Sequence, residues 1–384
     1  MKIDNLLKLI PEGTFRELAV ETKVDTQVKK LSGEVIFKLI LFSMLNSDKL
    51  SLRVMETFLQ SARFKTFAHF DILEGKYNSI RDRICTINAA YFEKLFNTIF
   101  SIYNKELKEE GALSKTDSTY VSLATKLFSH GMVNGGKDSG NRFVKYSVNL
   151  KGSLPSSVKV FVDQAYISEE LALAEVINDT NCIQGNIVLF DRGLQSRNSF
   201  DKFTEGNKMF VTRANLPIRF KTAGAKDIAT KTAGSTVTIT SDETGFLYDR
   251  TGKQTQNQYR LMQGTMDKNG ETICFLTNIL DEDAYTIAAW YKQRWEIEVF
   301  FKFLKQHLNV KHLVSRDENG IKVMIYMTMI LAILIIAFKK INDIKSFKIA
   351  KLKFELALDN EIIQQIVLLC GGDPSKAAHL FSSA

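Results

Sequence analysis

The sequence predicts a mixed α/β core with a β-rich insertion, flanked by helical regions at both ends. Three observations predict this fold class. Up to about residue 108, apolar residues recur at three- and four-residue spacing, which is typical of helices. From about Ala112 to Leu280, short apolar runs alternate with helical patterns, which indicates a mixed sheet. From about Asp283 onward the pattern is helical again and rich in lysine.

The N-terminal region contains several amphipathic helical patterns. They are FRELAVETKV, SGEVIFKLILFSMLNS, SLRVMETFLQSARF and NAAYFEKLFNTIFSIYNKEL. Ser32, Ser51 and Ser79 stand where N-caps are expected. The stretch YNSIRDRICTINAAYFEKLF suits a helix-turn-helix with Arg81 and Arg83 exposed on one helix. A plain helical bundle explains the same stretch equally well.

The central region reads as strand, strand, helix, strand, helix, strand. ALSKTDSTYVSL and RFVKYSVNLKG are the first two strands, and the helix SEELALAEVIND leads to the apolar strand NIVLFDRG. A helix over residues 196–204 and the strand KMFVTRA follow. Residues 214–270 break the alternation with STVTIT, GFLYD and QYRLMQGTM, which predicts a small β-rich insertion. ICFLTNIL then resumes the main sheet.

Composition is that of an ordinary folded protein of two or three domains. The 384 residues are 45% hydrophobic and carry a net charge of +8, a modest basic excess that favours a polyanionic partner without requiring one. Four cysteines without a C-x-x-C pair, and acids and a proline near the N-terminus, favour a cytoplasmic protein. The uncharged run from Val323 to Phe338 is shorter than the about 20 residues of a membrane span, so we expect a buried core helix.

The stretch YKQRWEIEVFFKFLKQHL, residues 291–308, predicts one amphipathic helix. At about 100° per residue, a single narrow stripe of that helix carries five residues: Tyr291, Arg294, Glu298, Lys302 and Lys305. Glu296 falls about 140° from Tyr291, on the far side. Solvated i,i+4 ion pairs are the usual reason for such spacing. Two further acids, Asp117 and Asp191, favour a metal-binding role for Glu298 instead.

Asp117 ends the strand-like run ALSKTD, and Asp191 directly follows the apolar strand NIVLF. An unpaired carboxylate at a buried strand end is costly, so a partner or a metal is expected there. Two aspartates on neighbouring strands and Glu298 on a later helix can together hold two divalent ions. Oxygen ligands of this kind suit Mg²⁺ or Mn²⁺, and a two-metal site suits phosphodiester chemistry.

The spacing Y-x2-R-x3-E-x6-K, formed by Tyr291, Arg294, Glu298 and Lys305, resembles the signature of the insertion-sequence-four family of bacterial DDE transposases. DSTYVSL and LFDRGLQS resemble the blocks that carry that family's two aspartates, and FVTRAN resembles the run after the second. The resemblance covers roughly residues 112–315.

The resemblance implies a fold and a domain order. Residues 109–315 would form an RNase H-like catalytic core with the β-rich insertion at 214–270. Residues 1–108 would form a helical DNA-binding region, and residues 316–384 a helical C-terminal region that serves dimerisation.

The resemblance also implies an activity. Asp117, Asp191 and Glu298 would bind two Mg²⁺ or Mn²⁺ ions for cut-and-paste transposition. An activated water would cut at the transposon end, the freed 3′-OH would form a hairpin, and the reopened end would join target DNA. Tyr291, Arg294 and Lys305 would hold the terminal phosphates and the distorted end nucleotides.

On the same stripe, Lys305 and Lys302 are expected to contact DNA phosphates. A base-stacking role for Trp290 or Trp295 stays open beside a role in the core. The partners implied are double-stranded DNA (the transposon ends and the target) and a second copy of the chain, in the bacterial cytoplasm at the nucleoid and without a membrane. An RNase H-like nuclease without strand transfer, or a protein that only binds DNA, stays as the alternative.

Overall fold

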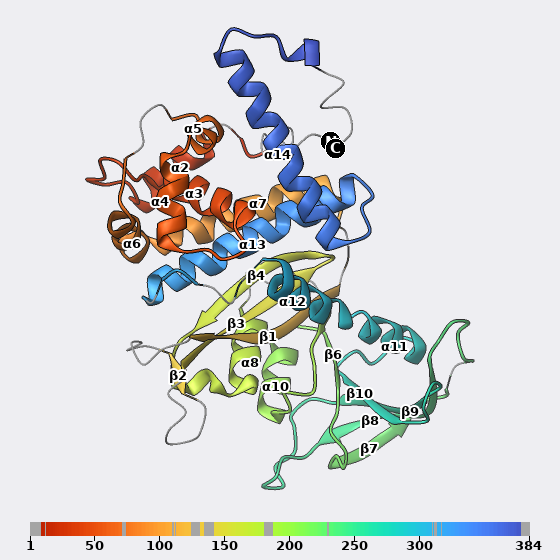
Figure 1. Cartoon of the computed structure of the whole chain (residues 1–384). Coiled ribbons are helices and arrows are strands. Elements are labelled where there is room, and N and C mark those ends of the chain that lie inside the picture. The colour runs from red at the N-terminus through yellow and green to blue at the C-terminus, as the bar shows by residue number, and fades with distance from the viewer. Residues whose placement is uncertain are drawn as a thin grey trace. The chain divides into compact units, whose positions relative to one another are not determined.

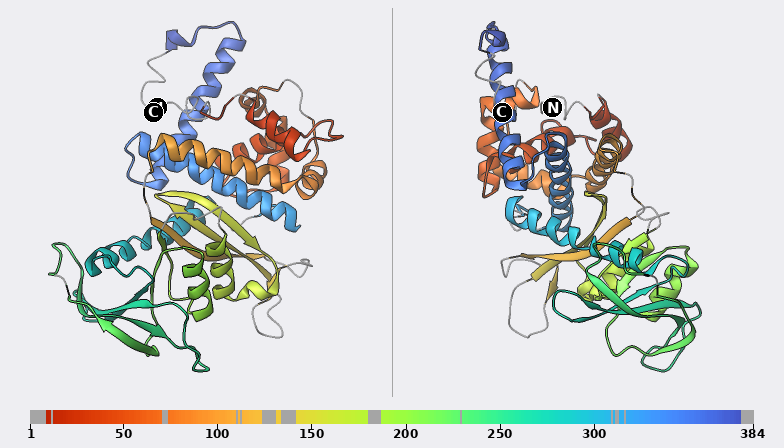
Figure 2. Two further views of the ribbon diagram at one scale, coloured as in Figure 1. Left: turned by 180° about the vertical axis from the view of Figure 1, so that it is seen from behind. Right: turned by 90° about the vertical axis from the view of Figure 1, so that its right-hand side faces the viewer.

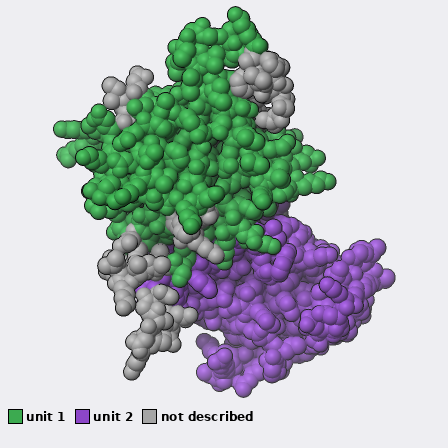
Figure 3. Space-filling view, in the orientation of Figure 1, with its two compact units in different colours: residues 1–109, 121–130, 302–384 green, residues 110–120, 131–301 purple. Residues whose placement is uncertain are grey.

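The structure is a computed structural model, and Figures 1 and 2 trace its chain. The described residues are 9–11, 13–70, 74–109, 111, 113–123, 131–133, 142–179, 187–228, 230–308, 310, 313–315 and 317–377. The chain forms two compact units, coloured separately in Figure 3. The helical unit comprises residues 1–109, 121–130 and 302–384, and the sheet unit comprises residues 110–120 and 131–301.

The helical unit is built from both ends of the chain. Its helices are α2 (Thr14–Thr22), α3 (Gly33–Asn46), α4 (Leu52–Gln60), α5 (Ala62–Ala68), α6 (Tyr77–Thr86), α7 (Ala89–Glu106), α13 (Glu318–Ile341), α14 (Phe347–Leu369) and the short η2 (Pro374–Ala377). Ser32 and Ser51 cap α3 and α4 as predicted, accepting from the backbone N–H of Val35 and Val54. The prediction for Ser79 is wrong, because α6 already begins at Tyr77.

Helix α13 is the core of the helical unit. Among the described residues it is the one helix long and apolar enough to cross a membrane, yet 94% of its apolar window is buried inside the protein. It packs against α7, α6, α3 and α14, and it runs beside α7 in Figures 1 and 2. The sequence-based interpretation as a core helix is therefore confirmed.

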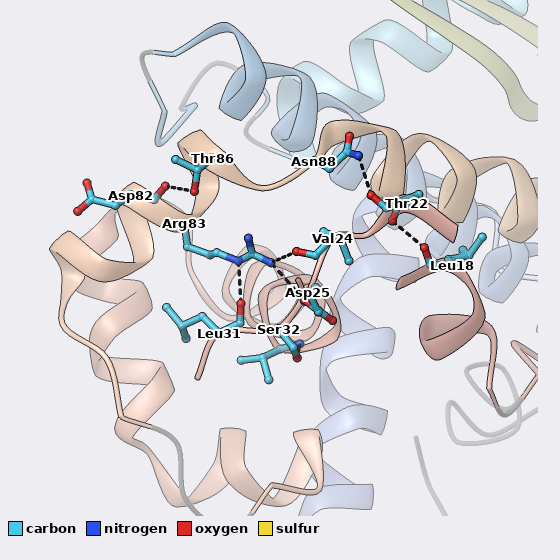
Figure 4. A network of polar contacts seen from close by, with 12 residues as sticks. Leu18, Thr22, Val24, Asp25, Leu31, Ser32, Asp82, Arg83, Thr86 and Asn88 are labelled. Carbon is cyan, nitrogen blue, oxygen red and sulfur yellow. Dashed lines mark hydrogen bonds and ion pairs between the residues drawn. The ribbon is translucent and has the colours of Figure 1, made fainter. Parts of the chain in front are cut away.

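Arg83 has a structural role that the sequence did not reveal. Its guanidinium donates to the carbonyls of Leu31 and Val24 at 2.8 Å each and to Asp25 at 3.2 Å (Figure 4). The expectation that Arg83 is exposed beside Arg81 is wrong, since only Arg81 is exposed. Arg83 instead joins α6 to the loop between α2 and α3.

The sheet unit contains one mixed sheet with the order β2-β3-β1-β5-β6-β10-β9-β8-β7, and β4 pairs with β3 (Figure 1). Its strands are β1 (Leu113–Leu123), β2 (Met132–Val133), β3 (Arg142–Lys151), β4 (Leu154–Phe161), β5 (Ile187–Leu189), β6 (Phe210–Arg213), β7 (Phe220–Ala225), β8 (Val237–Leu247), β9 (Tyr259–Met266) and β10 (Thr272–Thr277). Its helices are η1 (Gln164–Ile167), α8 (Glu169–Asn178), α10 (Arg197–Glu205) and α11 (Ala284–Lys292), and α12 (Trp295–His307) continues past residue 301.

Strands β1, β5 and β6 are parallel neighbours, whereas β10, β9, β8 and β7 extend the sheet in antiparallel order. The β-rich segment from 214 to 270 therefore continues the main sheet instead of forming a separate one. Strand β4 was missed by the sequence analysis. Its second residue is Pro155, which lacks an N–H and suits a strand at the margin of a sheet.

Alternate residues from Ile187 to Phe190, in β5 and directly after it, face two different cores. Val188 and Phe190 pack with α8 and α10, whereas Ile187 and Leu189 pack with α11. The sheet is therefore covered by α8 and α10 on one face and by α11 on the other, and both faces are apolar. This three-layer arrangement fixes the strand ends from which the candidate site is built.

Candidate active site

Asp117 and Asp191 lie on adjacent parallel strands in matching register. Leu113 pairs with Ile187 and Lys115 with Leu189, so the same offset places Asp117 opposite Asp191. Asp117 stands in the middle of β1, and the expectation that it ends a strand is wrong, because β1 continues to Leu123. Only β5 ends there, two residues before Asp191. The sheet thus brings the two predicted carboxylates together.

Each aspartate is oriented by a backbone amide. The Oδ1 of Asp117 accepts from the N–H of Ser118 at 2.7 Å, and the Oδ1 of Asp191 accepts from the N–H of Gly193 at 2.8 Å. Burial, followed by the charge of Asp191, raises the pKa of Asp117 to about 7. The N–H of Ser118 and the charge of Arg294 offset only part of this effect. A neighbouring negative charge disfavours the ionised form of a carboxyl group that is mostly removed from water, as Asp117 is.

The predicted single helix over residues 291–308 is wrong. Helix α11 ends at Lys292 and α12 begins at Trp295. Between them the N–H of Gln293 donates to Trp290 O at 2.9 Å, and that of Arg294 donates to Tyr291 O at 3.0 Å. These i→i−3 bonds tighten the turn and reset the helix. Neither glycine nor proline stands there, so the sequence contained no signal for the break.

Arg294 nevertheless joins the residues that the signature predicted. Its Nη1 lies 4.0 Å from Oδ2 of Asp117, and its Nη2 forms an ion pair with Oε1 of Glu298. Its guanidinium also lies over the ring of Tyr291, 5.8 Å from the centroid. The structure thereby places Asp117, Glu298 and Tyr291 around one cation.

Tyr291 is buried and packs edge-on against Phe275 of the sheet, with ring centroids 5.5 Å apart. Burial raises the pKa of the Tyr291 hydroxyl, and the charge of Asp191 raises it further. The positive charges of Arg294 and Arg213 offset part of this rise. Tyr291 thus lies close enough to Arg294 and to Asp191 to feel the charge of each. Arg213, at the end of β6, is a site residue that the sequence analysis did not single out, although FVTRAN contains it.

The two predicted lysines stand farther along α12. Lys302 and Lys305 follow Glu298 by about one and two turns of that helix, and both are exposed. Of the two tryptophans, Trp295 is 61% exposed, whereas Trp290 is partly buried and packs against the core beneath α11. Trp295 is the more exposed of the two.

Glu169 is a fourth acid at the site, and the sequence analysis did not single it out. It is the first residue of α8, where an acid is ordinarily explained by the helix dipole. Burial and the charge of Asp191 raise its pKa, and the charge of Lys145 lowers it. Lys145 itself is buried and donates to the carbonyl of Ile167 at 2.7 Å.

The donor set fits a hard divalent cation. The predicted ligands are carboxylates only, and Asp117 and Asp191 are like charges in a buried place, which a cation relieves. In the described part of the chain, no three Asp, Glu, His or Cys side chains are already gathered as a metal-binding group. Glu298 is turned toward Arg294 instead.

Comparison with known proteins decides the family. The family model described as "Transposase DDE domain" matches residues 135–335. The chain belongs to the DDE transposase family. The match includes Asp191, Glu298, Tyr291 and Arg294, and it begins after Asp117.

Curated relatives of this transposase agree. It is 26% identical over 270 residues to a probable transposase for insertion sequence element IS5377 from Geobacillus stearothermophilus, covering 67% of this chain and 68% of the relative. It is 25% identical over 259 residues to the putative transposase y4zB of Sinorhizobium fredii, covering 67% and 69%. A putative transposase for insertion sequence element IS4SA of Synechocystis is 29% identical over 236 residues, covering 60% and 62%.

Among solved structures, a piggyBac transposase synaptic complex with hairpin DNA matches with a TM-score of 0.44 and 11% identity. The match covers 94% of this transposase and 79% of that chain.

The predicted membership among bacterial insertion-sequence DDE transposases is confirmed by the family model and the relatives. The chain is accordingly a DNA transposase.

Proposed function

We propose that this transposase moves an insertion sequence by cut-and-paste transposition, through a hairpin intermediate, as a member of the insertion-sequence-four group. One observation carries the proposal. The parallel register of β1 and β5 sets Asp117 opposite Asp191, and Arg294 connects Asp117 to Glu298. This arrangement supports assigning Asp117, Asp191 and Glu298, which are far apart in the sequence, to one site.

Asp117, Asp191 and Glu298 are the proposed ligands of two Mg²⁺ or Mn²⁺ ions. Such ions, when bound, activate the attacking oxygen and stabilise the leaving oxygen of a phosphodiester. The chain's own contribution is to hold the carboxylates in place. Ser118 and Gly193 fix the aspartates through backbone N–H groups, and Arg294 orients Glu298 through an ion pair.

The basic and aromatic residues are the proposed binding site for the transposon end. Arg294 and Tyr291 lie at the carboxylates, where the terminal phosphates and the distorted nucleotide belong. Lys302 and Lys305 are exposed farther along α12 and contact backbone phosphate in this proposal. Trp295 supplies an exposed ring for a base unstacked in the hairpin.

The test is cleavage of labelled DNA carrying the element's own ends, in Mg²⁺, by wild type and by Glu298→Gln. Hairpinned and joined products from wild type, absent from the variant, support the proposal. Glu271→Gln, which removes an exposed acid before β10, is the matched control and keeps the activity. Nicks that never become hairpins or joined products would favour a nuclease, and binding without cutting in either Mg²⁺ or Mn²⁺ would favour a DNA-binding protein.

The partners in this proposal are double-stranded transposon ends, target DNA and a second copy of the chain. The basic net charge of +8 supports a polyanionic partner. We also propose that the chain works in the bacterial cytoplasm at the nucleoid. Burial of α13 in the helical unit argues against a membrane-anchoring role for that helix.

A further inference from the structure

Glu169 and Asp191 approach the same point of the backbone. A Cβ atom placed on Gly193 would lie 2.8 Å from the Cδ of Glu169 and 2.9 Å from both its Oε2 and the Oδ1 of Asp191. The two carboxylates therefore converge over Gly193, and the missing side chain of this glycine is what leaves them room. Asp117, opposite Asp191 in the sheet, is electrostatically coupled to both.

The position of Glu169 is fixed by its surroundings. It opens α8, where Ser168 caps the helix by accepting from the N–H of Leu171. Lys145, buried in β3, donates to the carbonyl of Ile167 at 2.7 Å and so ties the start of the helix to the sheet. A carboxylate on a helix that is held in this way is presented in a defined direction.

A purely structural role for Glu169 explains less. The helix dipole is equally served by Glu170, the next residue of the first turn, which lies within the electrostatic reach of Arg197. Lys145 gives its short hydrogen bond to a carbonyl, and in the described residues no ion pair within 4.0 Å joins it to Glu169. Glu169 is thus half-buried beside another acid, at a cost that calls for a cation.

We infer that Glu169 is a fourth carboxylate of the metal centre and shares with Asp191 the ligation of one divalent cation. This inference rests on the proposed function. Asp117, Asp191 and Glu298 supply three negative charges, and Glu169 brings the total to four, which balances two divalent cations.

The test is a titration of the full chain with Mn²⁺ in the absence of DNA. Binding is measured as the loss of the electron paramagnetic resonance signal of free Mn²⁺. Glu169→Gln is expected to weaken binding about tenfold or more, as loss of a group next to a metal does. Glu170→Gln is the matched control, because it removes the same charge from the same helical turn, and it should bind Mn²⁺ like wild type. Equal Mn²⁺ affinity in wild type and Glu169→Gln would overturn the inference.

Asp117→Asn and Asp191→Asn separate this inference from the proposed function. If these two variants lose Mn²⁺ binding and Glu169→Gln does not, only the role of Glu169 fails. If all three bind Mn²⁺ like wild type, the proposed metal centre itself fails.

Thermal unfolding distinguishes ligation from a structural role. In EDTA, Glu169→Gln is expected to unfold at the same temperature as wild type or higher, because it removes a like charge from beside Asp191. With Mn²⁺ added, wild type should gain thermal stability and Glu169→Gln should gain less. A variant that is less stable in EDTA and gains as much from Mn²⁺ as wild type would assign Glu169 to the fold alone, against the inference.

Discussion

At the scale of single residues, Asp117 makes the unliganded protein sensitive to pH. Its pKa rises from 3.8 to about 7 on folding, chiefly through burial and Asp191. An acid with a raised pKa stabilises the fold below its unfolded pKa, and that stability is lost as pH rises through the folded value. In EDTA, Asp117→Asn should therefore gain stability over wild type between about pH 4 and pH 7, up to about 4 kcal/mol.

Urea unfolding of both proteins in EDTA across that range measures the difference. The gap should be near zero at the acidic end and largest above neutrality. A gap that does not change with pH would show that Asp117 ionises in the folded protein as it does in the unfolded chain.

The two tryptophans are expected to behave differently. Trp295 is 61% exposed, so Trp295→Ala should leave the thermal stability unchanged while weakening binding of the transposon end by about 1–3 kcal/mol, the value of one stacked base. Trp290 packs against the core beneath α11, so Trp290→Ala should lower the unfolding temperature. Fluorescence anisotropy with end DNA and thermal unfolding measure the two effects. Unchanged DNA affinity in Trp295→Ala would remove the stacking role.

At the scale of elements, one ion pair between a buried lysine and an exposed glutamate joins α12 to β1. The Nζ of Lys115, whose side chain is 4% exposed, lies 2.9 Å from Oε2 of Glu296 and 3.0 Å from the carbonyl of Gly152. Lys115 is two residues before Asp117, and Glu296 is two residues before Glu298. The pair therefore aligns the helix that carries the third carboxylate with the strand that carries the first.

Glu296→Ala leaves the buried ammonium of Lys115 bonded to the carbonyl of Gly152 without its carboxylate, and it should cost about 1–3 kcal/mol of unfolding free energy. Glu318→Ala is the control, since its ion pair with Lys322 is exposed and should contribute less than about 1 kcal/mol. Urea unfolding measures both. An equal, small loss in the two variants would mean that the Lys115 pair does not hold α12.

The elements also show what the sequence was able to predict. Helix starts with a capping serine followed by apolar spacing, at Ser32 and Ser51, were predictable because capping is a local interaction. The break between Lys292 and Trp295 was not, because no glycine or proline marks it. Glu169 was missed for the opposite reason. An acid in the first helical turn is so common that only its tertiary neighbour, Asp191, distinguishes it.

At the scale of the whole molecule, periodicity predicts helices but not their partners. The run from Val323 to Phe338 predicted a core helix, and only the structure shows that α13 packs against α7, more than 200 residues earlier in the chain. More of the candidate site than of the helix packing could be predicted from the sequence, because the site residues form a signature with fixed spacing. The strand register that sets Asp117 opposite Asp191 depends on pairing between distant segments. From the sequence, only the order of the two aspartate-containing segments could be read.

Helix α14 bears on the expected second copy. Four of its exposed apolar residues recur at intervals of three, four and seven, which is the pattern of a helix that pairs with another helix. They are Ile349, Leu352, Leu356 and Ile363, with exposed fractions of 43%, 50%, 48% and 46%. Asp359 interrupts the pattern and forms an ion pair with Arg63, so this part of α14 is already held within its own unit.

We expect the double variant Leu352→Lys, Leu356→Lys to keep its fold, since both side chains are exposed, and to lose association between copies. Light scattering of the chain with and without end DNA measures the mass. Joining of both ends to target DNA measures the consequence, because in the proposed reaction two copies pair the ends before they are joined to the target. Val20→Lys is the control, as Val20 is a 74% exposed apolar residue on α2. An unchanged mass in the double variant, with wild-type end joining, would place the contact between copies elsewhere.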